Sequence, residues 1–178
     1  MKYLILLEGK TEQYFIDMLI EEGIFKIDVN DMIDMRPHHQ RQLSTKFKPH
    51  LLTLIKQLQP EEKVEIIRIG DKMSDKLAIP KDIRNKIQSE KKYCTKPEFE
   101  ILIIIDNDFY NEYLKVKSIQ KPKTFIKEKL GKMVCNNKDE NWIKSYFKDK
   151  NIYNLLEEYK KLSKHNKNEL YLVDLVNK

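Results

Sequence analysis

The chain has 178 residues, of which 40% are hydrophobic and 35% are charged, and its formal net charge is +6. This length suits one domain with a buried core, and the hydrophobic content is that of a globular protein with a heavily solvated surface. No apolar run approaches the roughly 20 residues of a membrane-spanning helix, and an acid interrupts the first apolar run too early for a secretory signal, so we expect a cytoplasmic protein.

The first predicted element is a strand, because residues 3–7 form an apolar run that ends abruptly in Glu8, Gly9 and Lys10. An apolar run bounded by a glycine turn is typical of a strand that is buried on both faces of a parallel sheet. A helical pattern begins at once with Thr11, which can cap the helix. Because functional residues in such sheets lie just beyond the carboxyl ends of the strands, Glu8 is a candidate site residue.

The segment after this helix is less regular. Residues 24–35 mix apolar and acidic side chains without a clear period and allow a short strand. A basic cluster follows, made of Arg36, His38, His39 and Arg41. Contact with phosphate or a proton relay is one interpretation of this cluster, and simple surface exposure is the other.

A second strand and a second acidic turn come next. Apolar residues at helical spacing predict a helix over 45–58, and the apolar run at 64–69 ends in a glycine followed by Asp71. This repeats the arrangement at Glu8, so Asp71 is a second candidate site residue. Asp75 lies four residues further along the chain and could join it.

The stretch that begins at Thr95 allows two interpretations. As a strand, the β-branched run 101–105 would bring Asp106 and Asp108 to the edge of the sheet, and the local sequence slightly favours this. As a helix, the same stretch would start from a capping box formed by Thr95 and Glu98. The two interpretations place different carboxylates in the site.

Helices dominate the other predicted elements, and residues 119–178 are expected to form a helical extension packed on a core of residues 1–118. Four helices and a C-terminal segment that forms either a helical turn or an edge strand are predicted at 80–90, 122–131, 139–147, 152–162 and 169–176.

Residues 115–138 contain eight lysines and one acid. Such a segment can present a cationic face to a phosphate backbone, which makes Lys121, Lys123 and Lys127 candidates for binding nucleic acid. A lysine-rich composition without a binding role accounts for the pattern equally well.

The string EGKTEQYF, with its leading apolar strand, resembles the first motif of Toprim-type nuclease domains, and especially of the small RloB-like proteins of bacterial defence loci. The pair Asp71 and Asp75 resembles the family's Asp-x-Asp element, although its spacing is wider. KPEFEILIII resembles the family segment in which a glutamate enters the site from the start of a helix. On that resemblance Glu100 is the third acid, with Asp106 and Asp108 as the runner-up pair.

The resemblance implies a Toprim-like, Rossmann-like α/β fold, in which helices flank a mainly parallel sheet and the C-terminal part is helical. It also implies a nuclease that hydrolyses phosphodiester bonds of DNA or RNA with Mg²⁺ or Mn²⁺, ions that prefer oxygen ligands such as those of Glu8, Asp71 and Glu100. Lys10 and Lys72, each beside a proposed ligand, could hold a phosphate oxygen, and simple surface exposure is the other interpretation. Proteins of this kind act against phage and are often encoded beside an ABC-type ATPase, which implies such a partner.

The alternative is a nucleic-acid-binding or assembly module that keeps the fold and has lost the metal centre, which the irregular aspartate spacing supports. Lysines directed at phosphate read no bases, so the choice among DNA, RNA and transfer RNA stays open, as does a homo-oligomer. Cys94 and Cys135 lack metal-ligand spacing and are expected to be plain thiols. The sequence also lacks the glycine-rich phosphate loop of an ATPase.

Overall fold

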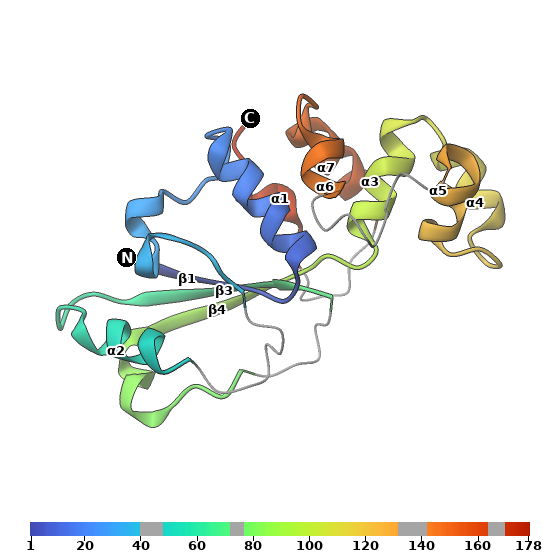
Figure 1. Cartoon of the computed structure of the whole chain (residues 1–178). Helices are drawn as coiled ribbons and strands as arrows, with labels where there is room; N and C mark the ends of the chain where they lie inside the picture. The colour runs from blue at the N-terminus through green and yellow to red at the C-terminus, as the bar shows by residue number, and fades with distance from the viewer. Residues whose placement is uncertain (40–47, 72–76, 132–141, 164–169) are drawn as a thin grey trace.

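The centre of the protein is a sheet of four parallel strands in the order β2-β1-β3-β4 (Figure 1). The computed structural model describes residues 1–39, 48–71, 77–131, 142–163 and 170–178. The strands, in chain order, are β1 (Lys2–Leu7), β2 (His38–His39), β3 (Val64–Gly70) and β4 (Ile87–Cys94). Together with the flanking helices, this sheet confirms the predicted α/β, Rossmann-like class.

The strand order reverses at β1. The chain leaves β1 through α1 (Lys10–Glu21) to pair β2 on one side, then returns through α2 (Pro49–Gln57) to pair β3 on the other side. In open α/β sheets the crevice at such a reversal, outside the carboxyl ends of the strands, is where ligands bind. The residues that follow β1 and β3 therefore flank this crevice.

Alternate residues of the central strands supply two separate cores. Ile5 and Leu7 of β1 pack on the side of α1, whereas Leu4 and Leu6 pack on the side of α2. All four side chains are fully buried, as expected for a strand covered on both faces. The apolar runs recognised in the sequence are therefore the two central strands of the sheet.

The C-terminal helices gather beyond the carboxyl ends of the strands (Figure 1). Helices α5 and α7 pack against α3, α6 packs against α1, and α7 also contacts the 3₁₀ turn η4. The helices of this part of the chain are α3 (Glu98–Asp106), α4 (Tyr110–Val116), α5 (Pro122–Leu130), α6 (Trp142–Phe147), α7 (Ile152–Leu162) and η4 (Leu172–Leu175). This placement puts helical residues opposite the crevice at the strand ends.

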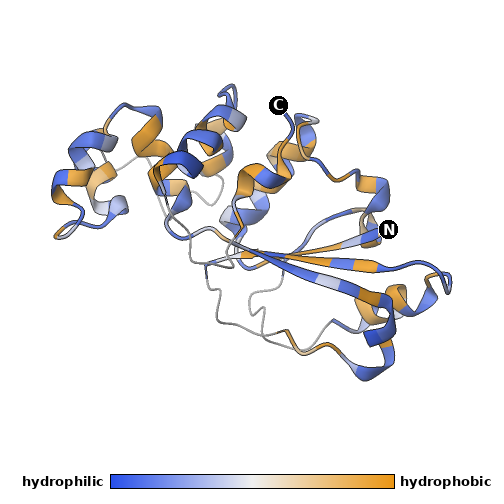
Figure 2. Cartoon of the chain, turned by 180° about the vertical axis from the view of Figure 1, so that it is seen from behind, coloured by the Kyte–Doolittle hydropathy of each residue, from blue (hydrophilic) through white to orange (hydrophobic). Residues whose placement is uncertain are grey.

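The prediction of a helix over residues 80–90 is wrong. A 3₁₀ turn, η3 (Lys81–Lys86), is followed directly by the edge strand β4, which appears mostly hydrophilic in Figure 2. Its polar side chains pair across the strands, since Ser89 Oγ donates to Glu65 Oε2 at 2.7 Å and Lys91 Nζ lies 2.9 Å from Glu65 Oε1. An edge strand stabilised by backbone pairing and polar contacts leaves little hydrophobic pattern in the sequence.

The stretch with two interpretations is helical, so the strand alternative is wrong. Residues 101–104 are all buried, which shows that α3 is surrounded by apolar neighbours and that packing overrides the β-propensity of the isoleucine run. The predicted capping box is also wrong, because Pro97 is the N-cap and the side chains of Thr95 and Glu98 turn inward. Similarly, α1 begins after Gly9 without a side-chain cap, so Thr11 is not its cap.

Three other segments refine the expectations. Residues 24–35 form two 3₁₀ turns, η1 (Val29–Asp31) and η2 (Ile33–Met35), instead of a strand. The C-terminal segment forms η4, with isolated bridges on either side of it. The start of the helix predicted over 139–147, for which Asp139 is the candidate cap, lies outside the described residues. In the described part of the chain, no helix is long and apolar enough to cross a membrane.

Candidate active site

Two acids meet where the strand order reverses. Glu8 follows β1 and Asp71 follows β3, and the backbone N–H of Asp71 donates a hydrogen bond of 2.7 Å to Glu8 Oε2. The backbone N–H of Glu8 in turn donates to the carbonyl of Ile69 at 3.0 Å. The parallel pairing of β1 with β3 thus fixes both residues at the carboxyl edge of the sheet, where the sequence predicted them.

A third acid, Glu12, lies beside this pair on the first turn of α1. Its side chain is only 6% exposed, and Thr95 Oγ1 donates to Glu12 Oε1 at 2.7 Å. The same hydroxyl lies 3.4 Å from Asp71 Oδ1. Burial raises the pKa of Glu12, the Thr95 hydrogen bond opposes this rise, and the charges of Asp71 and Glu8 add to it.

Gly9 permits this close approach. A Cβ atom at this position would lie 2.7 Å from Glu12 Oε2, which is closer than nonbonded carbon and oxygen atoms can come. The backbone at Gly9 is extended, with φ of −130°, so its role is to leave space. The glycine of the predicted turn therefore accommodates the buried carboxylate of Glu12.

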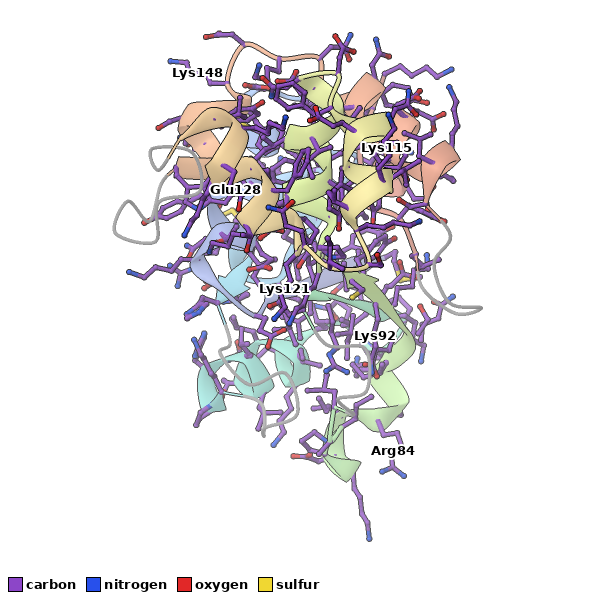
Figure 3. The ribbon with its side chains drawn as sticks, turned by 90° about the vertical axis from the view of Figure 1, so that its right-hand side faces the viewer. Arg84, Lys92, Lys115, Lys121, Glu128 and Lys148 are labelled. Carbon is purple, nitrogen blue, oxygen red and sulfur yellow. The ribbon has the colours of Figure 1, made fainter. Side chains whose placement is uncertain are left out.

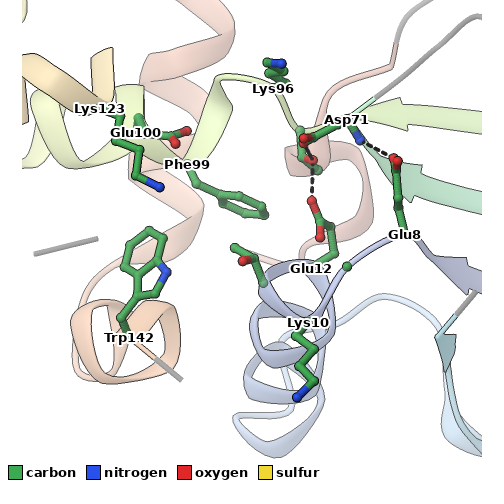
Figure 4. A pocket seen from close by; sticks show the side chains of 12 residues that line it. Glu8, Lys10, Glu12, Asp71, Lys96, Phe99, Glu100, Lys123 and Trp142 are labelled. Carbon is green, nitrogen blue, oxygen red and sulfur yellow. Dashed lines mark hydrogen bonds between the residues drawn. The ribbon is translucent and has the colours of Figure 1, made fainter. Parts of the chain in front are cut away.

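The opposite wall comes from the C-terminal helices (Figure 4). Glu100 of α3 and Lys123 of α5 lie near Trp142 of α6, and Phe99 projects between this group and the acids at the sheet edge. Burial raises the pKa of Glu100, the positive charge of Lys123 lowers it, and the negative charge of Asp71 raises it. The two walls are therefore electrostatically coupled.

Both walls enclose one pocket of about 510 Å³. It is lined by the residues named above and also by Lys10, Thr11 and Lys96. The pocket has the size of a small-molecule or nucleotide site and combines acids, lysines and aromatic rings.

All four residues that were predicted to be catalytic line this pocket. Glu8, Lys10, Asp71 and Glu100 are brought together with Lys123. In Figure 4, however, the Lys10 side chain extends along α1 and away from Glu8 and Asp71. Asp75 and Lys72 lie outside the described residues.

The remaining predicted site residues lie elsewhere. Lys121, the N-cap of α5, and Lys127, within α5, are both exposed. Lys121 is labelled on the side of the molecule seen in Figure 3. Asp106, at the far end of α3, accepts a hydrogen bond from Tyr146 at 2.6 Å and pairs with Lys150 at 2.7 Å. Asp108 follows α3 with a left-handed φ of 59°. The runner-up aspartates therefore do not line the pocket.

A second polar cluster lies outside the pocket and contains two histidines, His38 of the basic cluster and His50 of α2. Asp34, His38 and His50 have ligand atoms that all lie within 4.8 Å of one another, so they could hold a metal ion. Among the residues that the structure describes, no other group of three such side chains is this well arranged, the pocket carboxylates included. Burial lowers the pKa of His38.

Sequence reasoning missed Glu12, Thr95 and Trp142 as parts of the pocket. Glu12 carried a usable signal, because an acid three residues after a strand-end glycine falls in the first turn of the following helix. Thr95 and Trp142 carried none, since they reach the pocket only through the pairing of β4 and the packing of α6.

Comparison with protein-family models finds no match for this chain, and comparisons with curated proteins and with solved structures find none either.

Proposed function

We propose that the pocket is the active site of a divalent-metal-dependent nuclease that hydrolyses phosphodiester bonds of DNA or RNA. The observation that supports this most is the convergence of Glu8, Asp71 and Glu100 on one pocket from three separate parts of the chain. These are the three acids that the resemblance to Toprim-type, RloB-like domains names as the site. On the same resemblance, the protein would be the effector subunit of an anti-phage system with an ABC-type ATPase partner.

The donor atoms of the pocket suit Mg²⁺ or Mn²⁺ in kind, because both ions prefer carboxylate oxygen and water. Mg²⁺ is often held by only one or two carboxylates, so a tight three-acid cage is not required. We assign Glu8 and Asp71 as the residues that would hold the ion, with Glu100 on the facing wall. When bound, the ion would neutralise the phosphodiester and orient the attacking water.

The other pocket residues have roles that follow from their chemistry. Lys123 and Lys96 would attract the phosphate backbone. Phe99 and Trp142 offer aromatic surfaces on which a nucleobase can stack. Thr95 would position the acids, since its hydroxyl contacts the carboxyl groups of both Glu12 and Asp71.

The test is cleavage of labelled plasmid DNA and of total RNA with Mg²⁺ or Mn²⁺, with and without any ABC-type ATPase encoded beside the protein. Glu8→Gln should lower metal-dependent cleavage by about 100-fold or more, because it removes a proposed ligand. Glu61→Gln is the matched control, since Glu61 is exposed and precedes β3 at the opposite edge of the sheet. Equal activity of Glu8→Gln and the wild type would contradict the proposal.

A second candidate is a non-catalytic module that binds nucleic acid or supports assembly. The observation in its favour is that, in the described part of the chain, the pocket carboxylates do not form a group of three with their oxygens close enough to bind one ion together. If wild type and Glu8→Gln are equally inert with the partner present, and both bind nucleic acid, this second function is correct.

A further inference from the structure

Three elements bring one carboxylate and two imidazoles together at the edge of the sheet, apart from the carboxylate pocket. Asp34 belongs to η2, His38 to β2 and His50 to the first turn of α2. The two imidazole rings lie 5.8 Å apart between centroids, and one ligand atom from each of the three residues lies within 4.8 Å of the others. None of these residues lines the pocket.

His38 is held in one orientation and one tautomer. It is 5% exposed, and its Nε2 lies 3.1 Å from the backbone carbonyl of Ile33. A carbonyl only accepts hydrogen bonds, so Nε2 carries the proton and the neutral ring keeps its lone pair on Nδ1. Histidines that bind metals typically donate their other N–H to a carbonyl or carboxylate in this way.

The backbone at Asp34 supports the same arrangement. Asp34 and Met35 adopt left-handed φ values of 60° and 51°, a conformation that costs energy outside glycine and that aspartate tolerates better than most residues. Arg36 contacts only Oδ2 of Asp34, through Nε at 3.0 Å and Nη2 at 2.9 Å. These two contacts leave Oδ1 of the carboxylate for another partner.

We propose that Asp34, His38 and His50 bind a transition-metal ion of the Zn²⁺ class at a site separate from the carboxylate pocket. Imidazole nitrogen suits Zn²⁺, Co²⁺ and Ni²⁺, whereas Mg²⁺ prefers oxygen ligands. Three protein ligands leave a fourth tetrahedral position open to water or another ligand.

Such an ion would hold the shortest strand of the sheet, β2, in place. β2 has two residues, and His38 and His39 pair with Leu6 and Leu7, immediately before Glu8. The ion would connect β2 to η2 and to α2. We therefore expect it to stabilise the folded chain as well as to bind.

The experiment uses the full chain, freed of metal, and titrates it with Co²⁺ while the visible absorption is recorded, followed by competition with Zn²⁺. One equivalent of Co²⁺ should give the intense bands of a tetrahedral site, and Zn²⁺ should remove them. Free Zn²⁺ at a hundredfold excess over the dissociation constant should also raise Tm by roughly 5–10 °C.

Two variants change proposed ligands at exposed positions. His50→Ala changes an exposed helix residue, and Asp34→Asn keeps a side chain that tolerates the left-handed backbone. Each variant should weaken metal binding at least about tenfold, because changing a residue that only hydrogen-bonds to a metal ligand already has an effect of this size. His39→Ala is the matched control, because His39 pairs with Leu7 and so faces the other side of the sheet.

Wild-type binding that His50→Ala and Asp34→Asn leave unchanged would overturn the proposal, as would failure of the wild type to bind Co²⁺ or Zn²⁺ at micromolar concentration. These results do not depend on nucleic-acid cleavage, so the outcome is independent of the proposed nuclease.

Discussion

At the residue scale, Thr95 provides the hydrogen bond that compensates the burial of Glu12. Its hydroxyl donates to Glu12 Oε1 at 2.7 Å, and the pKa of Glu12 is raised mainly by burial. Without this donor, the ionised carboxylate would be buried beside two other acids. The Thr95 hydroxyl therefore favours the ionised form of Glu12 against the effect of burial.

Thr95→Val should lower the free energy of unfolding by about 1.5–3 kcal/mol, the range for a hydrogen bond to a charged group. The hydrogen bond favours the ionised form of Glu12, so the loss should be larger at pH 8 than at pH 4. Urea unfolding at the two pH values measures the effect. Thr95→Ser keeps the hydroxyl and should restore most of the stability; an equal loss for both variants would rule out the hydrogen bond as the cause.

At the element scale, one aromatic side chain holds α6 on α1 and thereby places one wall of the pocket. Phe147 is fully buried, and its ring meets Phe15 of α1 edge-on at 5.7 Å between centroids. Trp142, at the start of the same helix, lines the pocket. Docking of a six-residue helix is thus linked to the shape of the site.

Phe147→Ala should cost about 3–5 kcal/mol, because it leaves a cavity in the core between α1 and α6. Trp142 is the only tryptophan of the chain, so its fluorescence reports on α6 directly. We expect the emission to shift to longer wavelength at a urea concentration at which far-UV circular dichroism is still native. Ile119→Ala, at an 87% exposed residue, is the control and should change neither signal. Coincident unfolding of both probes in Phe147→Ala would show that α6 does not detach separately.

At the scale of the whole molecule, the C-terminal segment buries a carboxyl group of the core. Glu98 at the start of α3 is fully buried, and neither of its oxygens has a hydrogen-bond partner with good geometry among the described residues. Burial raises its pKa well above the usual value of 4.5, the negative charge of Asp174 adds to this, and the backbone of Leu172 offsets it in part. Asp174 and Leu172 both belong to η4, so the environment of Glu98 exists only when the C-terminal segment is packed against the start of α3.

A carboxyl with a raised folded-state pKa binds more protons when folded than when unfolded. Its contribution to stability is therefore greatest below pH 4.5 and declines as the pH rises above that value. Glu98→Met removes this decline and the unpaired oxygens, so the variant should be more stable than the wild type by about 1–3 kcal/mol at pH 8. The advantage should shrink at pH 4. Chemical denaturation at both pH values measures it.

Glu61→Met, at an exposed residue, is the control for this comparison and should show no such pH-dependent difference. A wild type that gains stability relative to Glu98→Met as the pH rises would mean that Glu98 is ionised and paired in the folded protein.

The sequence by itself determined the two central strands and the acids that follow them. An apolar run that ends in glycine and an acid indicates a strand buried on both faces of a sheet. Consecutive residues of the sequence are enough to show this pattern. Once β1 and β3 are parallel neighbours, Glu8 and Asp71 must lie at the same edge. The helix carrying Glu100 followed from the resemblance, whereas local propensity favoured a strand there.

Only the tertiary structure decided the rest of the site. Thr95 reaches Glu12 across 83 positions of sequence because β4 pairs with β3, and a polar edge strand has no apolar period to reveal it. Trp142 enters the pocket because α6 docks on α1, and His50 meets His38 because α2 covers that face of the sheet. Each of these contacts depends on a partner that is distant in the sequence, so the local pattern of hydrophobic and polar residues does not predict it.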